Sequence, residues 1–360
     1  MAVSCGIVGL PNVGKSTIFS AFSAAQAEVG NFPFCTIEPN MAVVEVPDKR
    51  LELIHGFIET DRVLPAVVQV VDIAGLVKGA SEGEGMGNQF LGNIKECSAI
   101  MHVVRCFEGQ KVIREEAVDP VGDIEVIELE LALADLVTVR RACERCAKKA
   151  RVDKEASNLL SVYQKAEALL EQGRQLRSSD WTKEERKILK PLCPLTLKPV
   201  LYVANVSDED LDGSSTHAKA VAQHAMANGS EWIPICGDIE LELRRMDEEE
   251  KEMFMKEFGV EELGLGRLTK SVYALLGLQT YFTAGEIEIR AWTIHEGDTA
   301  PVAAGVIHTD FQQKFIRAQV YSVGDLTEYG SEAAVKAAGK LRTEGKEYVM
   351  RDGDIAHFLI

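Results

Sequence analysis

The sequence has 360 residues, enough for two or three domains of ordinary size. Its 39 Lys and Arg against 56 Asp and Glu give a formal net charge of −17. This charge argues against a protein that coats nucleic acid, because phosphate binding depends on clustered Lys and Arg. Hydrophobic residues make up 46% of the chain, so a sizeable core can form and global disorder is excluded.

No segment has the ~18 consecutive apolar residues of a membrane-spanning helix, and no basic and then apolar leader opens the chain. We therefore expect no membrane partner. The eight cysteines are scattered, and without a secretion signal they are expected to be reduced thiols. These features predict a cytoplasmic protein.

The first 126 residues alternate short apolar runs with Gly-rich loops, and similar runs return at 199–206 and 231–236. The runs read SCGIVG, MAVVEV, AVVQVVDIAG, AIMHVVRCFE, PVLYVANV and EWIPIC. Continuously apolar strands separated by helical stretches are typical of parallel sheets that are buried on both faces. This part of the chain is therefore predicted to be an α/β domain with a mostly parallel sheet and helices on both faces.

Residues 127–195 interrupt this pattern with a segment rich in Ala, Leu, Glu, Lys and Arg. Apolar residues at helical spacing, among them Leu129, Leu133 and Leu136, predict one helix, and a second apolar series from Leu159 predicts another. Residues 151–156 can supply the turn between them. The segment is thus predicted to be an antiparallel helical pair inserted in the α/β domain.

The charge of this insert differs from that of the rest of the chain. Residues 127–195 carry a net charge of +3, and all the segments around them are acidic. Within the insert, residues 140–154 hold seven Lys or Arg and two acidic side chains. Such a run is either a solvated helical face or a docking surface for an anionic partner.

From residue 278 the pattern changes again. TYFTA and EIEIRAWTI alternate like the strands of a hairpin, and EAAVKAAGKLR has a helical pattern. EYVM and IAHFLI flank RDGD like the strands of a closing hairpin. Residues 278–360 are therefore predicted to be a separate small α+β domain.

Residues 9–16, GLPNVGKS, match the phosphate-loop pattern GxxxxGK[ST], with an apolar strand before them and a helical segment after them. In such loops the backbone amides surround the β-phosphate, the lysine lies between the β- and γ-phosphates, and the hydroxyl binds Mg²⁺. These roles fall to Lys15 and Ser16. The pattern predicts a binding site for a nucleoside triphosphate.

A second motif indicates hydrolysis. The apolar run 67–71 continues into DIAG, the DxxG pattern of GTPase-like P-loop proteins. Asp72 is expected to hold Mg²⁺ through a water molecule, and the Gly75 amide to sense the γ-phosphate. Thr36 is the candidate threonine that closes over Mg²⁺, and the glycine-dense residues 75–88 are suited to order and disorder with the γ-phosphate.

The base-recognition segment departs from the guanine-binding pattern. Guanine specificity usually comes from NKxD after an apolar strand; here Asn205 and Asp208 are present, but Val206 replaces the lysine. Without that lysine, packing along one face of the base is lost, and guanine selectivity does not follow. Cys236 ends the later strand, where a backbone amide can contact the base edge.

Together, these motifs resemble the Obg-like ATPase family of the YchF type. The resemblance is carried by GLPNVGKST, NFPFCTIEPN, DIAGLVKGASEGEGMGNQFL, LTLKPVLYVANV, LQTYFTAGEIEIRAWTI and the GVIHTDF–FIRAQV stretch, spread over the whole chain. It implies a G domain over residues 1–277 with a helical coiled-coil insert at 127–195, followed by a TGS domain of β-grasp type over 278–360. It also implies hydrolysis of ATP in preference to GTP, and association with ribosomes.

The resemblance also implies roles for particular residues. The family's nucleotide loop corresponds to Asn12, Val13, Gly14, Lys15, Ser16 and Thr17. Its adenine-contact segment corresponds to Asn205 and Val206, and its Mg²⁺ ligands to Ser16 and Thr36. Asn12 is in addition a candidate ligand of K⁺, and Asp208 stands where the family usually has Glu.

Catalysis needs a group that the usual motifs do not supply. Leu76 follows DxxG where many GTPases carry a water-orienting Gln, and Arg114 stands where family members often carry His. Arginine cannot act as a base at neutral pH, but it can stabilise charge on a transferring phosphate. Arg114 is therefore a candidate catalytic residue beside Lys15, Asp72 and Gly75, the alternative being a solvated loop charge.

These observations predict a Mg²⁺-dependent P-loop ATPase that acts as a nucleotide-dependent switch on the ribosome. The basic insert and the C-terminal domain are the expected contacts to ribosomal RNA, and no DNA partner is expected. Two alternatives remain open: a GTP-preferring GTPase in ribosome assembly, and a nucleotide-gated ribosome-binding module in which hydrolysis is incidental.

Overall fold

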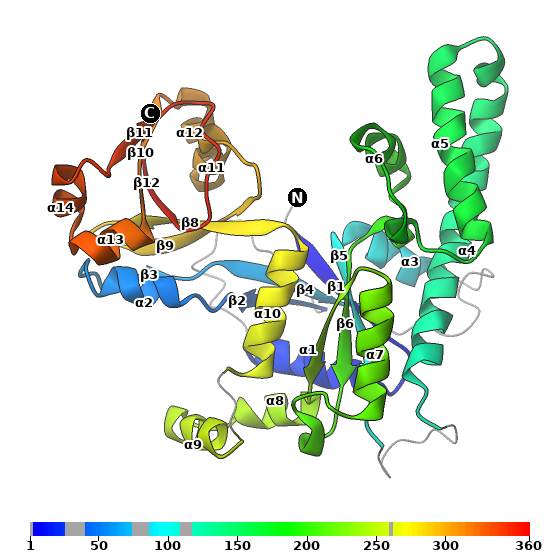
Figure 1. Ribbon diagram of the computed structural model, residues 1–360, viewed down its shortest axis with the longest axis horizontal. Coiled ribbons are helices and arrows are strands. Elements are labelled where there is room, and N and C mark those ends of the chain that lie inside the picture. The colour runs from blue at the N-terminus through cyan, green and yellow to red at the C-terminus, as the bar shows by residue number, and fades with distance from the viewer. Residues whose placement is uncertain (1–2, 26–39, 74–85, 109–116, 259–261) are drawn as a thin grey trace. The chain divides into compact units, whose positions relative to one another are not determined.

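The computed structural model describes residues 3–25, 40–73, 86–108, 117–258 and 262–360 (Figure 1). These residues form two compact units. Among the described residues, the first unit contains 3–24, 40–42 and 69–265, and the second contains 25, 43–68 and 266–360. None of the helices in the described ranges is long and apolar enough to cross a membrane.

The first unit is built on a sheet with the strand order β2-β4-β1-β5-β6-β7. The strands are β1 (Ser4–Val8), β2 (Met41–Glu45), β4 (Val67–Asp72), β5 (Ala99–Arg105), β6 (Val200–Asn205) and β7 (Glu231–Ile235). The pairs β1–β4, β1–β5, β5–β6 and β6–β7 are all parallel. β1, β5 and β6 are buried along their whole length, as strands covered on both faces must be. The predicted α/β class is confirmed.

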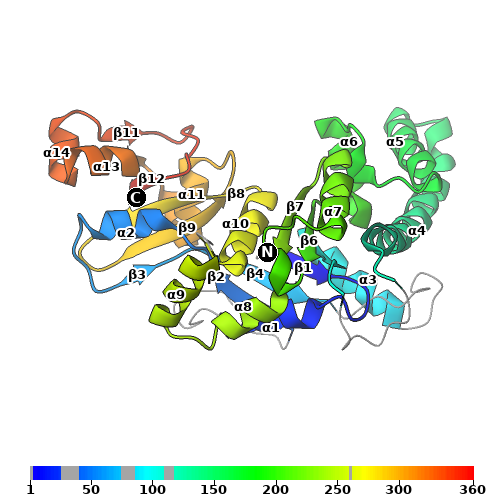
Figure 2. The ribbon, with the colours of Figure 1, turned by 60° about the horizontal axis from the view of Figure 1, so that its bottom comes forward.

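Helices cover both faces of this sheet (Figure 2). On one face α1 (Lys15–Ala24) packs against α8 (Gly237–Leu243), and on the other α7 (Thr216–Ala227) packs against α4 (Pro120–Ala147). The remaining helical elements of this unit are α3 (Met86–Glu96), η7 (Asp208–Asp210) and α9 (Glu248–Phe258). α10 (Gly264–Leu275) begins in the first unit and continues into the second.

The predicted helical pair of the insert is confirmed as α4 and α5 (Lys154–Glu171). The turn lies slightly earlier than predicted, through η3 (Lys149–Arg151), because the Asp153 side chain accepts a hydrogen bond from the Glu155 amide at 2.9 Å and starts α5 at Lys154. Leu136 and Leu159 pack against the buried core of the pair. Leu129 and Leu133 are 52% and 40% exposed, so only part of the apolar series faces that core.

The chain returns from α5 to the sheet through η4 (Leu176–Ser178), α6 (Lys183–Leu189), η5 (Lys190–Leu192) and η6 (Leu195–Leu197). The buried carboxylate of Asp135 holds the last of these elements, η6, against α4. It accepts hydrogen bonds from the Leu195 amide at 2.9 Å, the Thr196 amide at 2.7 Å and the Thr196 hydroxyl at 2.6 Å. The hydrogen bonds satisfy a carboxylate that would be costly to bury alone.

The second unit contains a mixed sheet with the order β11-β10-β12-β8-β9-β3. Its strands are β3 (Val63–Leu64), β8 (Leu278–Ala284), β9 (Ile289–His295), β10 (Arg317–Ser322), β11 (Arg342–Glu344) and β12 (Asp354–Leu359). The predicted hairpin β8–β9 is confirmed. The predicted closing hairpin is wrong: β12 pairs antiparallel with β10 and parallel with β8, so both of its edges are taken before the residues preceding it could pair.

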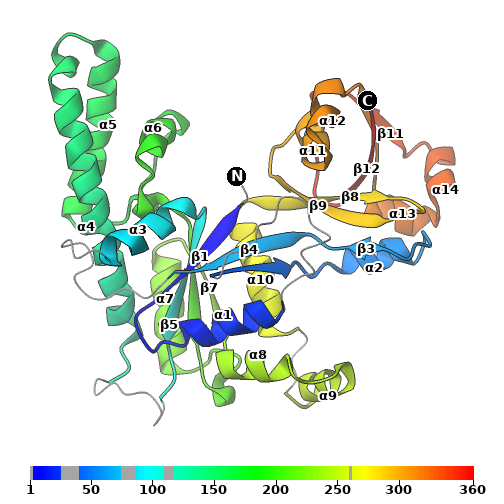
Figure 3. The same ribbon diagram turned by 180° about the vertical axis from the view of Figure 1, so that it is seen from behind.

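Helices lie on both faces of this second sheet (Figure 3). α11 (Ala300–Ile307) contributes to a core with Tyr281, Trp292 and Phe358, and α12 (Thr309–Lys314) packs against α11. On the other face α2 (Lys49–His55) contacts β9 and α13 (Val323–Tyr329). The predicted helix near residue 335 is present as α14 (Glu332–Ala337).

Candidate nucleotide-binding site

The predicted site residues that the structure describes gather at one edge of the parallel sheet. Residues 9–14 connect β1 to α1, Asp72 ends β4, Asn205 ends β6, and Cys236 follows β7. Because the carboxyl ends of parallel strands meet at the same edge, residues far apart in sequence come together there. This edge is where open α/β sheets bind ligands.

The phosphate loop has a backbone that few side chains tolerate. Asn12 and Gly14 have φ values of 63° and 90°, both in the left-handed region that favours glycine. A Cβ atom on Gly14 would lie 2.0 Å from Nδ2 of Asn205. Glycine at this position therefore permits both the loop conformation and the close approach of β6.

Lys15, the first residue of α1, forms an ion pair with Asp72 at the end of β4. Their side chains are 10% and 22% exposed, so the pair is mostly shielded from water. The Asp72 amide donates to the carbonyl oxygen of Asn40 at 2.8 Å, which fixes the end of the strand. The pair places a cation at a helix N-terminus, a position that already favours phosphate.

Asn205 fastens the phosphate loop to the base-recognition segment. Its Nδ2 donates to the Val13 carbonyl oxygen at 2.9 Å, and its Oδ1 accepts from the Gly237 amide at 3.1 Å. Asn205 is 5% exposed, so both bonds lie in a dry environment. Gly237 belongs to the strand end that was expected to contact the base edge, but its bond to Asn205 was not predicted. The only sign of it in the sequence is its position directly after Cys236 at a strand end.

The other predicted base-contacting residues differ in exposure. Val206 and Cys236 are 2% and 7% exposed, whereas Asp208 is exposed at the surface. Burial raises the pKa of the Cys236 thiol, which therefore stays protonated and unreactive. Thr17 lies on α1 beside the start of α8, since a Cβ on Gly237 would lie 3.5 Å from its Cγ2.

Three predicted residues, Thr36, Gly75 and Arg114, lie outside the described residues, as does Leu76. For Mg²⁺, Ser16 and Asp72 offer hydroxyl and carboxylate oxygens, the ligand type that this ion prefers. No cluster of three His, Cys, Asp or Glu side chains suited to a metal occurs in the described part of the chain. The donor set fits an ion that keeps most of its ligands from phosphates and water.

A buried polar cluster around Glu128 anchors the insert to the sheet. One Glu128 oxygen accepts hydrogen bonds from Arg177 Nη2 and the Tyr202 hydroxyl, both at 2.5 Å, and His224 Nε2 lies 3.7 Å from the other. Burial alone raises the Glu128 pKa, but His224, Arg177 and Tyr202 outweigh it and lower this pKa to about 2. His102 of β5 lies beside the Tyr202 ring, and burial lowers its pKa to about 4. The cluster thus joins α4 and η4 of the insert to β5 and β6.

The positive charge of the insert is concentrated at its tip, residues 148–154. Arg140 precedes the tip, on α4. It donates to Glu167 at 3.1 Å and to Glu171 at 2.6 Å, so two carboxylates of α5 lie against its charge. The tip holds four Lys or Arg and one Asp, and none of the ion pairs between described residues involves these cations. Val152 at its centre is 92% exposed.

Comparison with known proteins places this geometry among close relatives. Residues 4–138 match a family model described as "50S ribosome-binding GTPase", and residues 278–360 match a YchF GTPase C-terminal model described as "Protein of unknown function (DUF933)". The chain is 51% identical over 361 residues to the Ribosome-binding ATPase YchF of Escherichia coli O157:H7, with 100% of this chain and 99% of that protein covered.

Two further relatives come from other lineages. The chain is 47% identical to the Ribosome-binding ATPase YchF of Bacillus subtilis (strain 168), with 99% of each sequence covered. Among solved structures, that of the Schizosaccharomyces pombe YchF GTPase is similar, with a TM-score of 0.90 and 37% identity over 99% of this chain and 97% of that one. The likeness therefore includes the α/β sheet, the insert and the C-terminal sheet.

Proposed function

The chain belongs to the YchF family, and on that premise we propose that it is a Mg²⁺-dependent ATPase whose nucleotide state controls its binding to the ribosome. The observation that carries the proposal is the ion pair between Lys15 of the phosphate loop and Asp72 at the end of β4. It holds together a phosphate-binding cation and a metal-binding carboxylate. The names of the relatives, Ribosome-binding ATPase, support both ATP and the ribosome.

In this proposal the loop from Asn12 to Thr17 surrounds the phosphates with its amides, and Lys15 turns from Asp72 to the β- and γ-phosphates. Ser16, Thr36 and Asp72 would hold Mg²⁺, Asp72 through water; the ion neutralises charge on the phosphates. Asn12 is a candidate ligand for K⁺ beside the same phosphates. The Gly75 amide contacts the γ-phosphate, and Arg114 stabilises its charge during transfer.

The preference for ATP rests on the relatives' names and on Val206. This buried valine occupies the position where guanine-binding proteins carry lysine. Asp208, an exposed carboxylate of the guanine-reading type, favours GTP as the alternative nucleotide. The family model and the fission yeast relative are also described as GTPases.

The decisive experiment compares wild type with Lys15→Ala by calorimetry with Mg²⁺–ATP and Mg²⁺–GTP. Loss of the lysine should weaken ATP binding by about 100-fold or more, the equivalent of ~2.7 kcal/mol. Lys187→Ala, which removes an exposed lysine on α6, is the control and should bind normally. A wild-type preference for GTP of about tenfold or more would overturn the choice of ATP.

For the partner, we propose that the insert tip contacts ribosomal RNA, together with the C-terminal domain over residues 278–360. The tip is cationic, exposed and free of carboxylate partners among the described residues, which suits contact with phosphates. With a ribosome as the partner, we also propose a cytoplasmic location. The functional domains proposed are 1–277, with the insert at 127–195, and 278–360.

The tip is tested by two double variants with the same change of charge. Lys148→Glu/Lys149→Glu alters the tip, and Lys183→Glu/Lys187→Glu alters α6 in the same insert. In co-sedimentation with ribosomes at rising salt, the tip variant should lose about tenfold or more in affinity and show a shallower salt dependence. Equal effects of both variants would exclude a specific role of the tip.

The same assay separates a switch from a module in which hydrolysis is incidental. Wild type should bind ribosomes differently with ATP, with ADP and without nucleotide. Identical binding under the three conditions would contradict control by the nucleotide.

A further inference from the structure

Residues 43–68 belong to the second unit, although they precede Asp72 in the sequence. Strand β3 within this segment pairs in parallel with β9, with Val63 opposite Ile289. The Ile289 amide donates to the carbonyl oxygen of Arg62 at 2.9 Å. The segment thus supplies an end strand of the C-terminal sheet.

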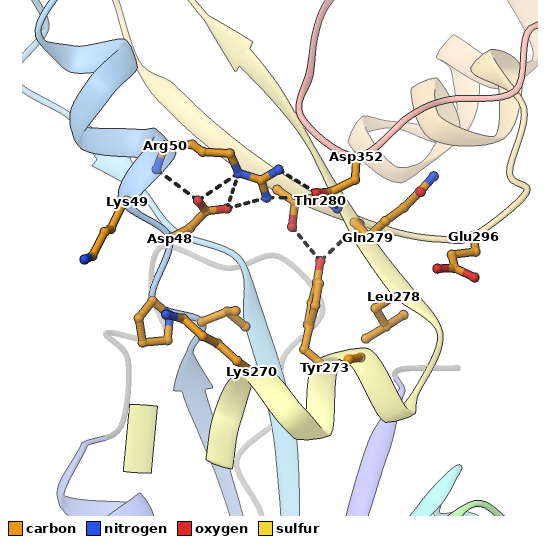
Figure 4. Close-up of a pocket in the computed structure, with 13 residues that line it drawn as sticks. Asp48, Lys49, Arg50, Lys270, Tyr273, Leu278, Gln279, Thr280, Glu296 and Asp352 are labelled. Atoms are coloured by element: carbon orange, nitrogen blue, oxygen red, sulfur yellow. Dashed lines mark hydrogen bonds and ion pairs between the residues drawn. The ribbon is translucent and has the colours of Figure 1, made fainter. Parts of the chain in front are cut away.

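Side chains fasten the start of α2 to the same unit (Figure 4). Arg50 donates through Nε to Asp48 at 2.9 Å and through Nη1 to Asp352 at 2.6 Å, and its guanidinium lies 5.1 Å from the centre of the Phe282 ring. Asp352 also accepts from the Thr280 amide of β8 at 2.9 Å. One arginine therefore ties α2 to the loop before β12 and to β8.

The Arg50 bridge lies at the wall of a cavity of about 550 Å³ and not in the core. Its side chain is 30% exposed and that of Asp352 is 53% exposed. The core contacts of α2 come from Leu51 and Ile54, which are 6% and 0% exposed. Substitutions at the bridge therefore leave the hydrophobic packing of α2 in place.

The connection from this segment to the nucleotide site is short. β3 ends at Leu64 and β4 begins at Val67, so two residues link them and the Cα atoms of Leu64 and Val67 can lie at most ~11 Å apart. β4 then runs to Asp72, which lies opposite Ile7 of β1 and pairs with Lys15. The chain thus passes from the end of β3 at Leu64 to the carboxylate of Asp72 within eight residues.

We propose that Arg50 and Asp352 are positioning residues for the nucleotide reaction. By holding α2, which precedes β3 in the chain, against the C-terminal unit, they set the position of β4 and of Asp72 at its end. The inference rests on the proposed nucleotide function and adds to it that the C-terminal unit responds to the nucleotide. Coupling of this kind is reciprocal: nucleotide binding stabilises the β3–β9 pairing, and loosening that pairing weakens nucleotide binding.

The first test measures hydrogen exchange of the full chain with and without Mg²⁺–AMP-PNP. Exchange of the Ile289 amide, whose bond depends on the β3–β9 pairing, should slow by about fivefold or more at saturation. The amides of β10 and β11, on the opposite side of the sheet, should not change. Unchanged exchange at Ile289 in protein shown by calorimetry to be saturated overturns this inference and leaves the ATPase proposal standing. Absence of binding overturns both.

The second test uses matched variants. Arg50→Ala and Asp352→Asn should each raise the KM for ATP by about fivefold with little change in kcat and in the thermal unfolding midpoint. Arg342→Ala is the control, since Arg342 bridges Asp354 and Glu344 in the same unit and is 33% exposed, but lies on β11. Arg50→Lys should restore KM only in part, because the lysine ammonium lacks the planar set of donors with which a guanidinium bridges two carboxylates.

These variants separate positioning from general stability. A rise in KM that appears equally in Arg342→Ala, or only together with a fall in the unfolding midpoint, would mean a merely structural role and overturn the proposal.

Discussion

The side-chain amide of Asn205 donates a hydrogen bond to the carbonyl oxygen of Val13 at 2.9 Å, across 192 residues of sequence. The other end of the same amide accepts from Gly237 at the start of α8. The end of β6 thus holds the phosphate loop and α8 in register. Asn205 acts through these elements, and its polar atoms are already engaged before any base is bound.

Asn205→Ala should weaken ATP binding by about tenfold and lower the free energy of unfolding by about 3 kcal/mol, because it leaves a buried carbonyl and a buried amide without partners. Asn205→Asp keeps the acceptor for Gly237 but loses the donor to Val13, so it separates the two bonds. Calorimetry and urea unfolding provide the measurements. Asn228→Ala is the control, because the side chain of Asn228 donates to the carbonyl oxygen of His224 in the helix directly before it. Equal losses of ATP affinity in Asn205→Ala and Asn228→Ala would contradict the role of Asn205 in holding the phosphate loop.

Gly14→Ala should abolish ATP binding, since its Cβ would lie 2.0 Å from Asn205. Gly173→Ala is a matched control. Gly173 has a similar φ of 71°, but a Cβ there meets no atom within 4 Å. The control should therefore lose about 1 kcal/mol of stability from backbone strain alone and bind ATP normally. Similar binding by the two variants would contradict the importance of the close approach.

Asp72→Asn should make ATP binding almost indifferent to Mg²⁺. With Mg²⁺ the affinity should fall by about tenfold or more, because a carboxylate is lost. In EDTA the affinity should stay the same or rise, because Lys15 is released from its ion pair. The measurement is a titration of ATP with and without Mg²⁺, and Asp180→Asn, an exposed carboxylate after η4, is the control. An equal loss of ATP affinity in EDTA would instead indicate that the substitution damages the phosphate loop.

Stability should fall as the pH drops from 6.5 toward 4, because of His102. Its folded pKa of about 4 lies below the ordinary histidine value of 6.5, so in this window the unfolded chain binds a proton that the folded chain does not. Between pH 7 and pH 5, His102 should account for a loss of about 2 kcal/mol in the free energy of unfolding. The stability from Glu128, with a folded pKa of about 2, remains until below pH 4.5.

Urea unfolding at pH 7 and pH 5 checks this expectation. In His102→Gln the difference in the free energy of unfolding between pH 7 and pH 5 should be smaller than in wild type by about 2 kcal/mol. Met101→Leu, at a buried neighbouring position without a titratable group, should retain the wild-type difference. An unaltered pH dependence in His102→Gln would remove His102 as its source.

Local patterns were sufficient for most of the secondary structure. Continuous apolar runs predicted β1, β5 and β6, because strands buried on both faces admit few polar residues. The helical spacing of Leu129, Leu133 and Leu136, and of the apolar series from Leu159, predicted the helical pair, although Leu129 and Leu133 turn out to be exposed. The predictions that failed concern pairing: the residues before β12 do not pair with it, since β10 and β8 occupy both of its edges.

In the candidate site, too, some features could be predicted from local sequence and others could not. The loop residues Gly14, Lys15 and Ser16 are contiguous, so their motif can be recognised without a structure. Neither the use of Asn205 to fasten Val13 nor the neutralisation of Arg140 by Glu167 has a local signal. Both depend on which side chains the folded elements bring within reach.

The sequence by itself determined that this protein carries a phosphate loop, a DxxG carboxylate and a basic insert in an acidic chain, because contiguous residues and their charges express these features directly. Only the tertiary structure decided that β3, which precedes Asp72 in the sequence, joins the C-terminal sheet, and that Arg50 meets Asp352 across 302 positions. The reason is physical: a strand pairs with whichever edge remains open in the completed sheet. That edge is a property of the folded chain and not of the segment that fills it.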